Sequence, residues 1–331
     1  MEKIKSVFLL ALKVSIVSGV LYYLTTQGRL NLRLVPELLN RPSLFFALFL
    51  ALLLGMVFPS MVRWWCLLRA LGIGMKLRKA VSVTWISIFF STFLPGAISG
   101  DLVKAFYIRK EHPEHSKSLL FSTLLVDRIL GLLAILLLAG FAIFVMQPFE
   151  GAGDGWELTG QILTGLICAF LMGGLLIIFP FSQNRDPVQR ILSKLPASRI
   201  TLKVHNAFTL YRDHKKTLAL GLLLSLMIQL TEVLCFKLLI DQLSQGGAFT
   251  DLLAVVPIGE ISTIIPVAPA GIGVGHLAFE YLFQSAGMSA GADMFTLFTL
   301  VRLIVLLLGG FPYLVYRKSG GPTMLDGPFS N

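Results

Sequence analysis

Long apolar stretches constrain the fold of this chain more than any other feature of its sequence. An α-helix needs about 20 apolar residues to cross the hydrocarbon core of a bilayer, where the backbone must satisfy its own hydrogen bonds. Six stretches meet this length, at residues 7–26, 43–66, 118–146, 158–181, 217–240 and 293–316. The chain is 55% hydrophobic and 14% charged, which excludes an ordinary soluble domain. We therefore expect an all-α polytopic membrane protein with six spanning helices, in which residues 1–331 form a single integral membrane domain.

Two further apolar stretches, 80–110 and 249–285, are interrupted by Pro and Gly. Residues 91–101 (STFLPGAISGD) and 262–273 (STIIPVAPAGIG) both read Ser-Thr, two apolar residues, Pro, and a Gly five residues later. Pro ends a helix, and each half of such a segment is short for a span. We expect two re-entrant helical hairpins, with two crossing helices per segment as the alternative. The turn residues would be Pro95, Gly96, Pro266 and Pro269.

The distribution of Lys and Arg among the loops indicates the orientation of the chain. These residues gather in three loops and at the C-terminus, at 63–79, 104–117, 182–216 and 317–318. Segments 147–157 and 241–251 contain none, although 27–42 contains three Arg that oppose the assignment. Because positive charge collects on the cytoplasmic side, we predict cytoplasmic N- and C-termini and a cytoplasmic loop at 182–216.

The same charges give the two hairpins opposite directions. Hairpin 80–110 lies between basic loops and would enter from the cytoplasm, whereas hairpin 249–285 would enter from outside. Residues 43–146 and 217–316 would then form an inverted repeat. Discontinuous helices that meet near the midplane in such a repeat are typical of transporters.

The second half of each hairpin would present a helix N-terminus at the turn. Free amides and the helix dipole favour an anion there. The residues expected to shape these two sites are Ser99, Gly100, Gly271 and Gly273. Asp101 complicates this interpretation, because a carboxylate in the first turn would satisfy the helix end itself and repel a phosphate. The alternative is that Pro and Gly only permit tight packing.

Each hairpin is followed by an Arg within an apolar run, Arg128 and Arg302. Charge at this depth is costly and usually functional, and a guanidinium binds phosphate through two hydrogen bonds. We expect both residues, with Lys104, to bind a substrate phosphate. The alternative is a structural ion pair with one of the carboxylates Asp101, Asp127, Glu232 and Glu260. Because neighbours on a helix do not share a face, the partner of Asp127 is expected elsewhere than Arg128.

The remaining ionisable residues predict gating or coupling rather than catalysis. The gating candidates are Asp101, Asp127, Glu232, Glu260, His276 and Glu280. His276 and Glu280 are one turn apart. A proton relay with an Asp is one interpretation, which the spacing alone does not support, and a metal site would lack a third ligand. The HPEH fragment at 112–115 is expected to be solvated. No GxSxG, HExxH or nucleotide loop occurs, so we expect no enzyme activity, no cofactor and no metal. The net charge of +10 is accounted for by cytoplasmic loops, so no nucleic-acid partner is expected.

Three segments resemble the lysylphosphatidylglycerol synthase transmembrane-region family: FLPGAISGDLVKAFYI, SLLFSTLLVDRILGLL and IIPVAPAGIGVGHLAFEYLF. The family includes flippase domains and stand-alone bacterial membrane proteins. The resemblance covers about residues 40–316 and implies a lipid-associated protein of the bacterial cytoplasmic (inner) membrane. Two departures affect the site: Ser99 replaces the first Gly of a Gly-Gly-Asp motif, and Gly275-His276 replaces Arg-Glu.

The favoured hypothesis is a flippase-like lipid translocase that works by alternating access. Its partner would be a membrane lipid, an anionic phospholipid or a polyprenyl-phosphate lipid. The second hypothesis is a membrane accessory or scaffold for an enzyme of envelope lipid or lipid-linked glycan synthesis. An integral-membrane lipid-headgroup transferase is the third, with Asp101, Glu260 or His276 as base.

Overall fold

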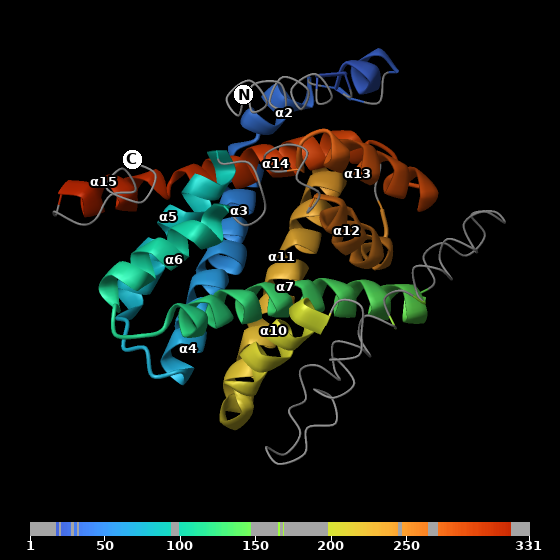
Figure 1. The fold of residues 1–331 in the computed structure, drawn as a ribbon. Coiled ribbons are helices and arrows are strands. Elements are labelled where there is room, and N and C mark those ends of the chain that lie inside the picture. Colours follow the sequence, from blue (N-terminus) through green and yellow to red (C-terminus); the bar gives the residue numbers. More distant parts are fainter. Residues whose placement is uncertain are drawn as a thin grey trace, which may run out of the picture.

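The described part of the chain is entirely helical in a computed structural model of residues 1–331 (Figure 1). The structure describes residues 18–19, 21–27, 30–31, 33–93, 99–146, 165, 168, 198–243, 247–263 and 271–318. The helices of the first half are α2 Leu34–Leu39, α3 Pro42–Ala51, the π-helix η1 Leu52–Val57, α4 Phe58–Ala70, α5 Leu77–Phe93, α6 Ser99–Glu111 and α7 Lys117–Met146. Those of the second half are α10 Ser198–Thr209, the 3-10 helix η2 Arg212–His214, α11 Lys215–Leu243, α12 Phe249–Thr263, α13 Val274–Ser285, α14 Gly291–Leu307 and α15 Gly310–Lys318.

Four helical segments of the described chain are long and apolar enough to cross a membrane. They are Pro42–Ala70, Lys117–Phe144, Arg212–Leu243 and Gly291–Val315. These segments agree with four of the six spans predicted from the sequence. The other two predictions, 7–26 and 158–181, fall largely outside the described residues. The chain is therefore an all-α membrane protein.

The first of these segments changes its helical pitch in the middle, where α3 passes through η1 into α4. Pro59 has no amide hydrogen, so the α-helical bond to the carbonyl of Gly55 cannot form. The hydroxyl of Thr231 on α11 lies 3.3 Å from that carbonyl and shares its hydrogen between it and the closer carbonyl of Met227, at 2.8 Å. Gly55 permits this close approach, because a Cβ atom there would lie 2.4 Å from the Thr231 hydroxyl oxygen. The π-helix thus ties the first span to α11 and sets the direction of α4.

Two pairs of short helices, α5 with α6 and α12 with α13, pack against each other within each pair. Their 17, 13, 15 and 12 residues give lengths of about 18 to 26 Å, less than the hydrocarbon thickness. The Ser87 hydroxyl donates to the carbonyl of Gly100 at 2.6 Å and joins α5 to α6. The turns at 94–98 and 264–270 lie outside the described residues, so the predicted turn residues Pro95, Gly96, Pro266 and Pro269 are not placed.

Aromatic rings form the centre of the second half of the molecule. Phe236 of α11 stacks on Phe279 of α13, and Phe279 stacks on Phe295 of α14, each with ring centroids 4.8 Å apart. Phe298 of α14 lies 4.8 Å from Phe236 on another side. All four rings are buried, so this cluster fixes α13 and α14 against the spanning helix α11.

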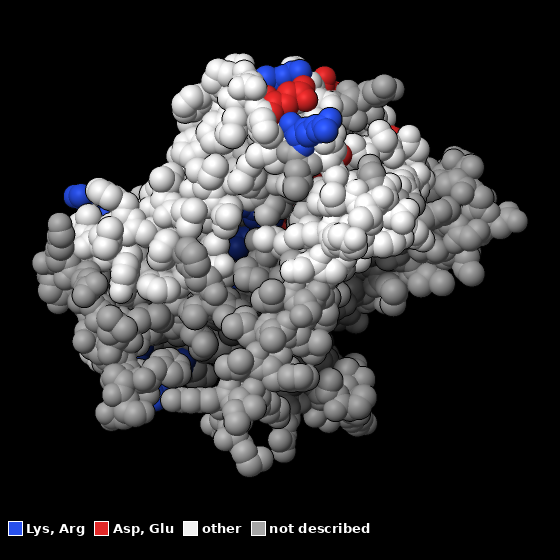
Figure 2. All heavy atoms as spheres, turned by 90° about the horizontal axis from the view of Figure 1, so that it is seen from above, with Lys and Arg blue, Asp and Glu red and all other residues white. Residues whose placement is uncertain are grey.

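Most of the described surface on the face seen in Figure 2 is white, with a group of blue and red residues at the top and a few further blue residues elsewhere. Large apolar side chains such as Phe46, Phe144 and Phe311 are mostly exposed. A surface of this composition is stable against lipid rather than water.

Helix α10 lies within the predicted loop 182–216 and packs against α7 (Figure 1). It buries Ala207 and Phe208 on one side, and Lys203 and Asn206 are exposed on the other. Tyr211, just after the helix, donates its hydroxyl to the carbonyl of Leu67 at 3.2 Å. This amphipathic helix therefore joins α7 to the end of α4.

Replacement of Gly291 by Ala should destabilise the protein by about 1–3 kcal/mol, the usual cost of overpacking. The new Cβ would lie 2.3 Å from the carbonyl oxygen of Phe279, a backbone atom that cannot rotate away. The measurement is the midpoint of thermal unfolding in detergent. Gly74→Ala is the control, since a Cβ at that position meets nothing within 4 Å. Equal midpoints for the two variants would contradict the packing of α13 against α14.

Candidate functional site

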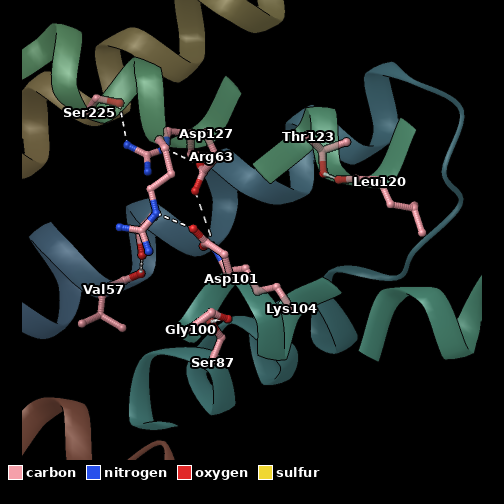
Figure 3. Close-up of polar contacts among 12 residues, drawn as sticks. Val57, Arg63, Ser87, Gly100, Asp101, Lys104, Leu120, Thr123, Asp127 and Ser225 are labelled. Carbon is pink, nitrogen blue, oxygen red and sulfur yellow. Dashed lines mark hydrogen bonds and ion pairs between the residues drawn. The ribbon is translucent and has the colours of Figure 1, made fainter. Parts of the chain in front are cut away.

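A buried carboxylate, Asp127 of α7, collects polar groups from three other helices (Figure 3). Arg63 of α4 donates from Nε to Asp127 Oδ1 at 2.7 Å, and its Nη1 donates to Ser225 of α11 at 2.6 Å. Lys104 of α6 places its Nζ 3.6 Å from Asp127 Oδ2. Arg63, Lys104 and Asp127 are all at most 8% exposed. One carboxylate therefore holds α4, α6, α7 and α11 together.

The neighbouring residue, Arg128, has a different partner and a different environment. Its Nε donates to Asp101 Oδ2 of α6 at 2.7 Å, while its side chain is 53% exposed and that of Asp101 only 12%. Asp127 and Arg128 thus face different ways, as expected for neighbours on a helix. Arg128 lies about 17 Å along α7 from Lys117 at 1.5 Å per residue, within the apolar part of this helix.

These five residues, Arg63, Asp101, Lys104, Asp127 and Arg128, form a cluster that we call the cationic cluster. Its three basic and two acidic groups leave one surplus positive charge. Lys104 is the least tightly paired base, because its Nζ is 3.6 Å from the carboxylate and 4.9 Å from the ring centroid of Trp64. A buried surplus cation is costly, and the cluster is therefore suited to an anion.

A second cluster, the acidic cluster, lies between α11, α12 and α14. Arg302 donates from Nη1 to both carboxylate oxygens of Glu260, at 3.2 and 3.1 Å. Glu232 of α11 is close enough to interact electrostatically with both residues. Its Oε2 is buried and has no hydrogen-bond partner among the described residues. Two carboxylates share one guanidinium, so this cluster has the opposite charge balance to the cationic cluster.

His276 and Glu280, the predicted relay pair, hold helix ends. His276 Nδ1 accepts the backbone amide of Gly273 at 3.2 Å, and its Nε2 is 3.0 Å from the hydroxyl of Thr296. Glu280 accepts the backbone amide of Ala292 at 3.0 Å, in the first turn of α14. Glu280 also accepts the side-chain amide of Gln284 at 2.7 Å. These bonds stabilise the starts of α13 and α14.

The backbone conformation or the close packing at the glycines predicted at the hairpins requires a residue without a Cβ atom. Gly271 and Gly273 have φ values of +70° and +92°, a region that residues with a Cβ rarely adopt. A Cβ at Gly271 would also lie 2.5 Å from Cβ of Thr263. A Cβ at Gly100 would lie 3.0 Å from the carbonyl oxygen of Ser87. The side chain of Ser99 is outside the described part of the chain.

The HPEH fragment brings three possible metal ligands together. Ligand atoms of His112, Glu114 and His115 all lie within 4.8 Å of one another. The pKa of Glu114 is lowered by hydrogen bonds from the backbone amide of Glu114 and from the side chain of His112. Glu114 is exposed on the loop between α6 and α7, whereas His112 and His115 are half-buried, so the expected solvated fragment is only partly solvated.

The sequence interpretation missed Arg63 and Ser225 as members of a site. It counted Arg63 among the loop cations, yet this residue is buried in α4 and hydrogen-bonded. Its position in the apolar run FPSMVRWWCLL was the available signal. The described contacts also place Arg128 and Arg302 in separate clusters, rather than on one shared partner.

Loss of the Asp127 charge should be severely destabilising. Asp127→Asn would leave Arg63 and Lys104 as buried cations without a counter-ion, a change that typically costs about 3–5 kcal/mol. We expect a large fall in the unfolding midpoint in detergent and a low yield of monodisperse protein. Asp213→Asn, in an exposed carboxylate of η2, should change the midpoint little. Similar midpoints for both variants would contradict a structural role for Asp127.

The sequence of this chain matches one family of membrane proteins. A family model described as the lysylphosphatidylglycerol synthase TM region matches residues 10–311. The chain is also similar to a UPF0104 membrane protein of Pyrococcus horikoshii, at 26% identity over 285 residues, which is 78% of this chain and 82% of that protein. No solved structure matches the chain.

Proposed function

Because the chain belongs to the lysylphosphatidylglycerol synthase transmembrane-region family, we propose that it is a lipid translocase. It would move an anionic or phosphate-containing lipid headgroup between leaflets by alternating access, without chemical conversion of the lipid. In this proposal α5–α6 and α12–α13 are re-entrant hairpins that enter from opposite sides, and the protein has six spans in an inverted repeat. Both termini would be on the cytoplasmic side of the inner membrane.

One observation carries this proposal: the exposure of Arg128. Its guanidinium is near mid-membrane depth, yet its side chain is 53% exposed. A guanidinium directed into lipid tails would be very costly, so the exposed face has to meet water or a polar ligand. The surplus positive charge of the cationic cluster favours a phosphate there. Asp101 would then act as a gate, because a phosphate would compete with it for Arg128.

The acidic cluster would supply gating or coupling. Arg302 is already held by Glu260 through two contacts, and Glu232 is buried beside them with an unpartnered oxygen. Two carboxylates and one guanidinium are one proton short of neutrality in a site of low dielectric. His276 and Glu280 are occupied as helix caps, so coupling rests on Glu232 and Glu260.

Arg128→Gln should slow leaflet exchange of an anionic lipid by about tenfold or more, the size expected from the loss of one charge-assisted hydrogen bond. The measurement uses liposomes that contain purified protein and fluorescent phosphatidylglycerol, with fluorescent phosphatidylcholine for comparison. Lys76→Gln, which removes an exposed cation before α5, is the matched control and should exchange lipid at the wild-type rate.

The outcomes of this experiment separate the hypotheses. Wild-type exchange by a well-folded Arg128→Gln variant would overturn the role given to Arg128. Absence of exchange in the wild-type protein would count against translocation and favour an accessory role beside an envelope-synthesis enzyme. New lipid products detected by mass spectrometry would favour the transferase.

Glu232→Gln should remove any response of exchange to an imposed pH gradient. The amide keeps the shape of the carboxyl group but cannot bind or release a proton. Glu260 and Arg302 lie beside Glu232. The helices packed against α11 also carry the paired Arg63 and Asp127, and farther along them Arg69, Lys117, Arg128, Asp251 and Asp293. The control is Glu37→Gln in α2, an exposed partner of Arg41. A variant that still follows the gradient would contradict coupling through Glu232.

A further inference from the structure

A large cavity lies between α6, α7 and α10, outside both charge clusters. Its volume is about 1170 Å³, more than the usual range for sites that hold drug-sized molecules. Residues of α6, of the loop that follows it and of the first two turns of α7 line it, together with residues of α10. The mechanism proposed above assigns no function to this cavity.

The cavity has a basic end. Arg109, Lys110, Lys117 and Lys203 line it, and none of its described lining residues is a carboxylate. Arg109 is fixed in place, since its Nη1 donates to the carbonyls of Pro113 at 3.0 Å and His115 at 2.5 Å. Lys110 lies 5.4 Å from the ring centroid of Phe106. Four cations along the cavity wall attract an anionic group, although Glu111 and Glu114 lie beside Lys110 and Pro113 in the sequence.

The rest of the wall is apolar and partly uncovered. Leu102 of α6 is 58% exposed, Phe121 of α7 is 54% exposed, and Leu210 after α10 is 43% exposed. Basic residues that continue into an apolar surface fit an amphiphile, with its charge at one end and its chains at the other. A free phosphate would leave this apolar wall uncovered.

The order of residues along the helices gives the cavity a direction. Arg109 and Lys117 lie at the connection between the antiparallel helices α6 and α7, whereas Leu102 and Leu125 lie farther from it. The Asp101–Arg128 pair joins the same two helices still farther from the connection. Asp101 is one residue past Leu102 in that direction, and Arg128 is three residues past Leu125. The cavity therefore leads from the basic connection toward Arg128, whose side chain is 53% exposed.

We propose that this cavity binds an anionic phospholipid of the adjacent leaflet and delivers its headgroup to Arg128. The phosphate lies among Lys117, Lys203 and Arg109, and the acyl chains run along Leu102 and Phe121. The delivery step rests on the proposed translocase function, whereas the binding site stands on the cavity and its charges alone. The charge balance favours an anionic over a zwitterionic lipid.

The binding test uses native mass spectrometry of the full chain in detergent, with phosphatidylglycerol and phosphatidylcholine added separately. The variant Lys117→Gln/Lys203→Gln should lose at least tenfold in affinity for phosphatidylglycerol, with little change for phosphatidylcholine. The control Lys76→Gln/Lys216→Gln removes two exposed cations away from the cavity and should bind as the wild type does. All four positions are exposed, so folding should be preserved.

Several outcomes would overturn the site: equal losses in the two double variants, or equal wild-type affinity for both lipids. Complete displacement by glycerol phosphate would assign the basic end to the free headgroup. Absence of a lipid adduct on the wild-type protein would contradict lipid binding and would favour a protein segment as the occupant of the cavity. Leaflet exchange measured in the same variants separates the two proposals. If the wild-type protein binds the lipid but does not exchange it, the translocase proposal is rejected and the binding site stands. If Lys117→Gln/Lys203→Gln exchanges lipid at the wild-type rate, delivery from the cavity to Arg128 is rejected.

Discussion

The buried carboxylate of Asp127 is the interaction on which the arrangement of α4, α6, α7 and α11 depends. It pairs with Arg63 and lies near Lys104, and Arg63 extends the network to Ser225 on α11. A charge removed from water is tolerated only when it is paired and hydrogen-bonded. The four helices that contribute these groups are therefore held in one arrangement, and Arg128 is displayed on the other side of α7.

The two halves of the described chain each hold an Arg–carboxylate pair. In each half the Arg lies on the long helix that follows two short helices, and the carboxylate belongs to one of those short helices. In the first half the acid is Asp101, at the start of the second short helix α6, whereas in the second half it is Glu260, in the first short helix α12. The first pair leaves its Arg more than half exposed, and the second leaves its Arg 28% exposed. The Arg128 pair is thus more accessible than the Arg302 pair.

Much of the fold could be predicted, because the length of an apolar run directly reports a membrane helix. Four of the six predicted spans appear among the described helices, and the short broken segments appear as paired helices. The separate directions of Asp127 and Arg128 also followed from helical periodicity. The partners of these residues did not follow, since Arg63 and Asp127 are far apart in sequence. The capping by His276 depends on Gly273, whose positive φ a sequence pattern does not report.

The sequence by itself predicted an all-α membrane protein, and four of its six predicted spans are among the described helices. Those features follow from local periodicity and from the cost of exposing backbone to lipid. Only the tertiary structure decided which charges are paired and which remain exposed, and that α6, α7 and α10 enclose a basic-ended cavity. Ion pairing and cavities depend on distances between helices, because charges on separate helices meet only after packing has set those distances.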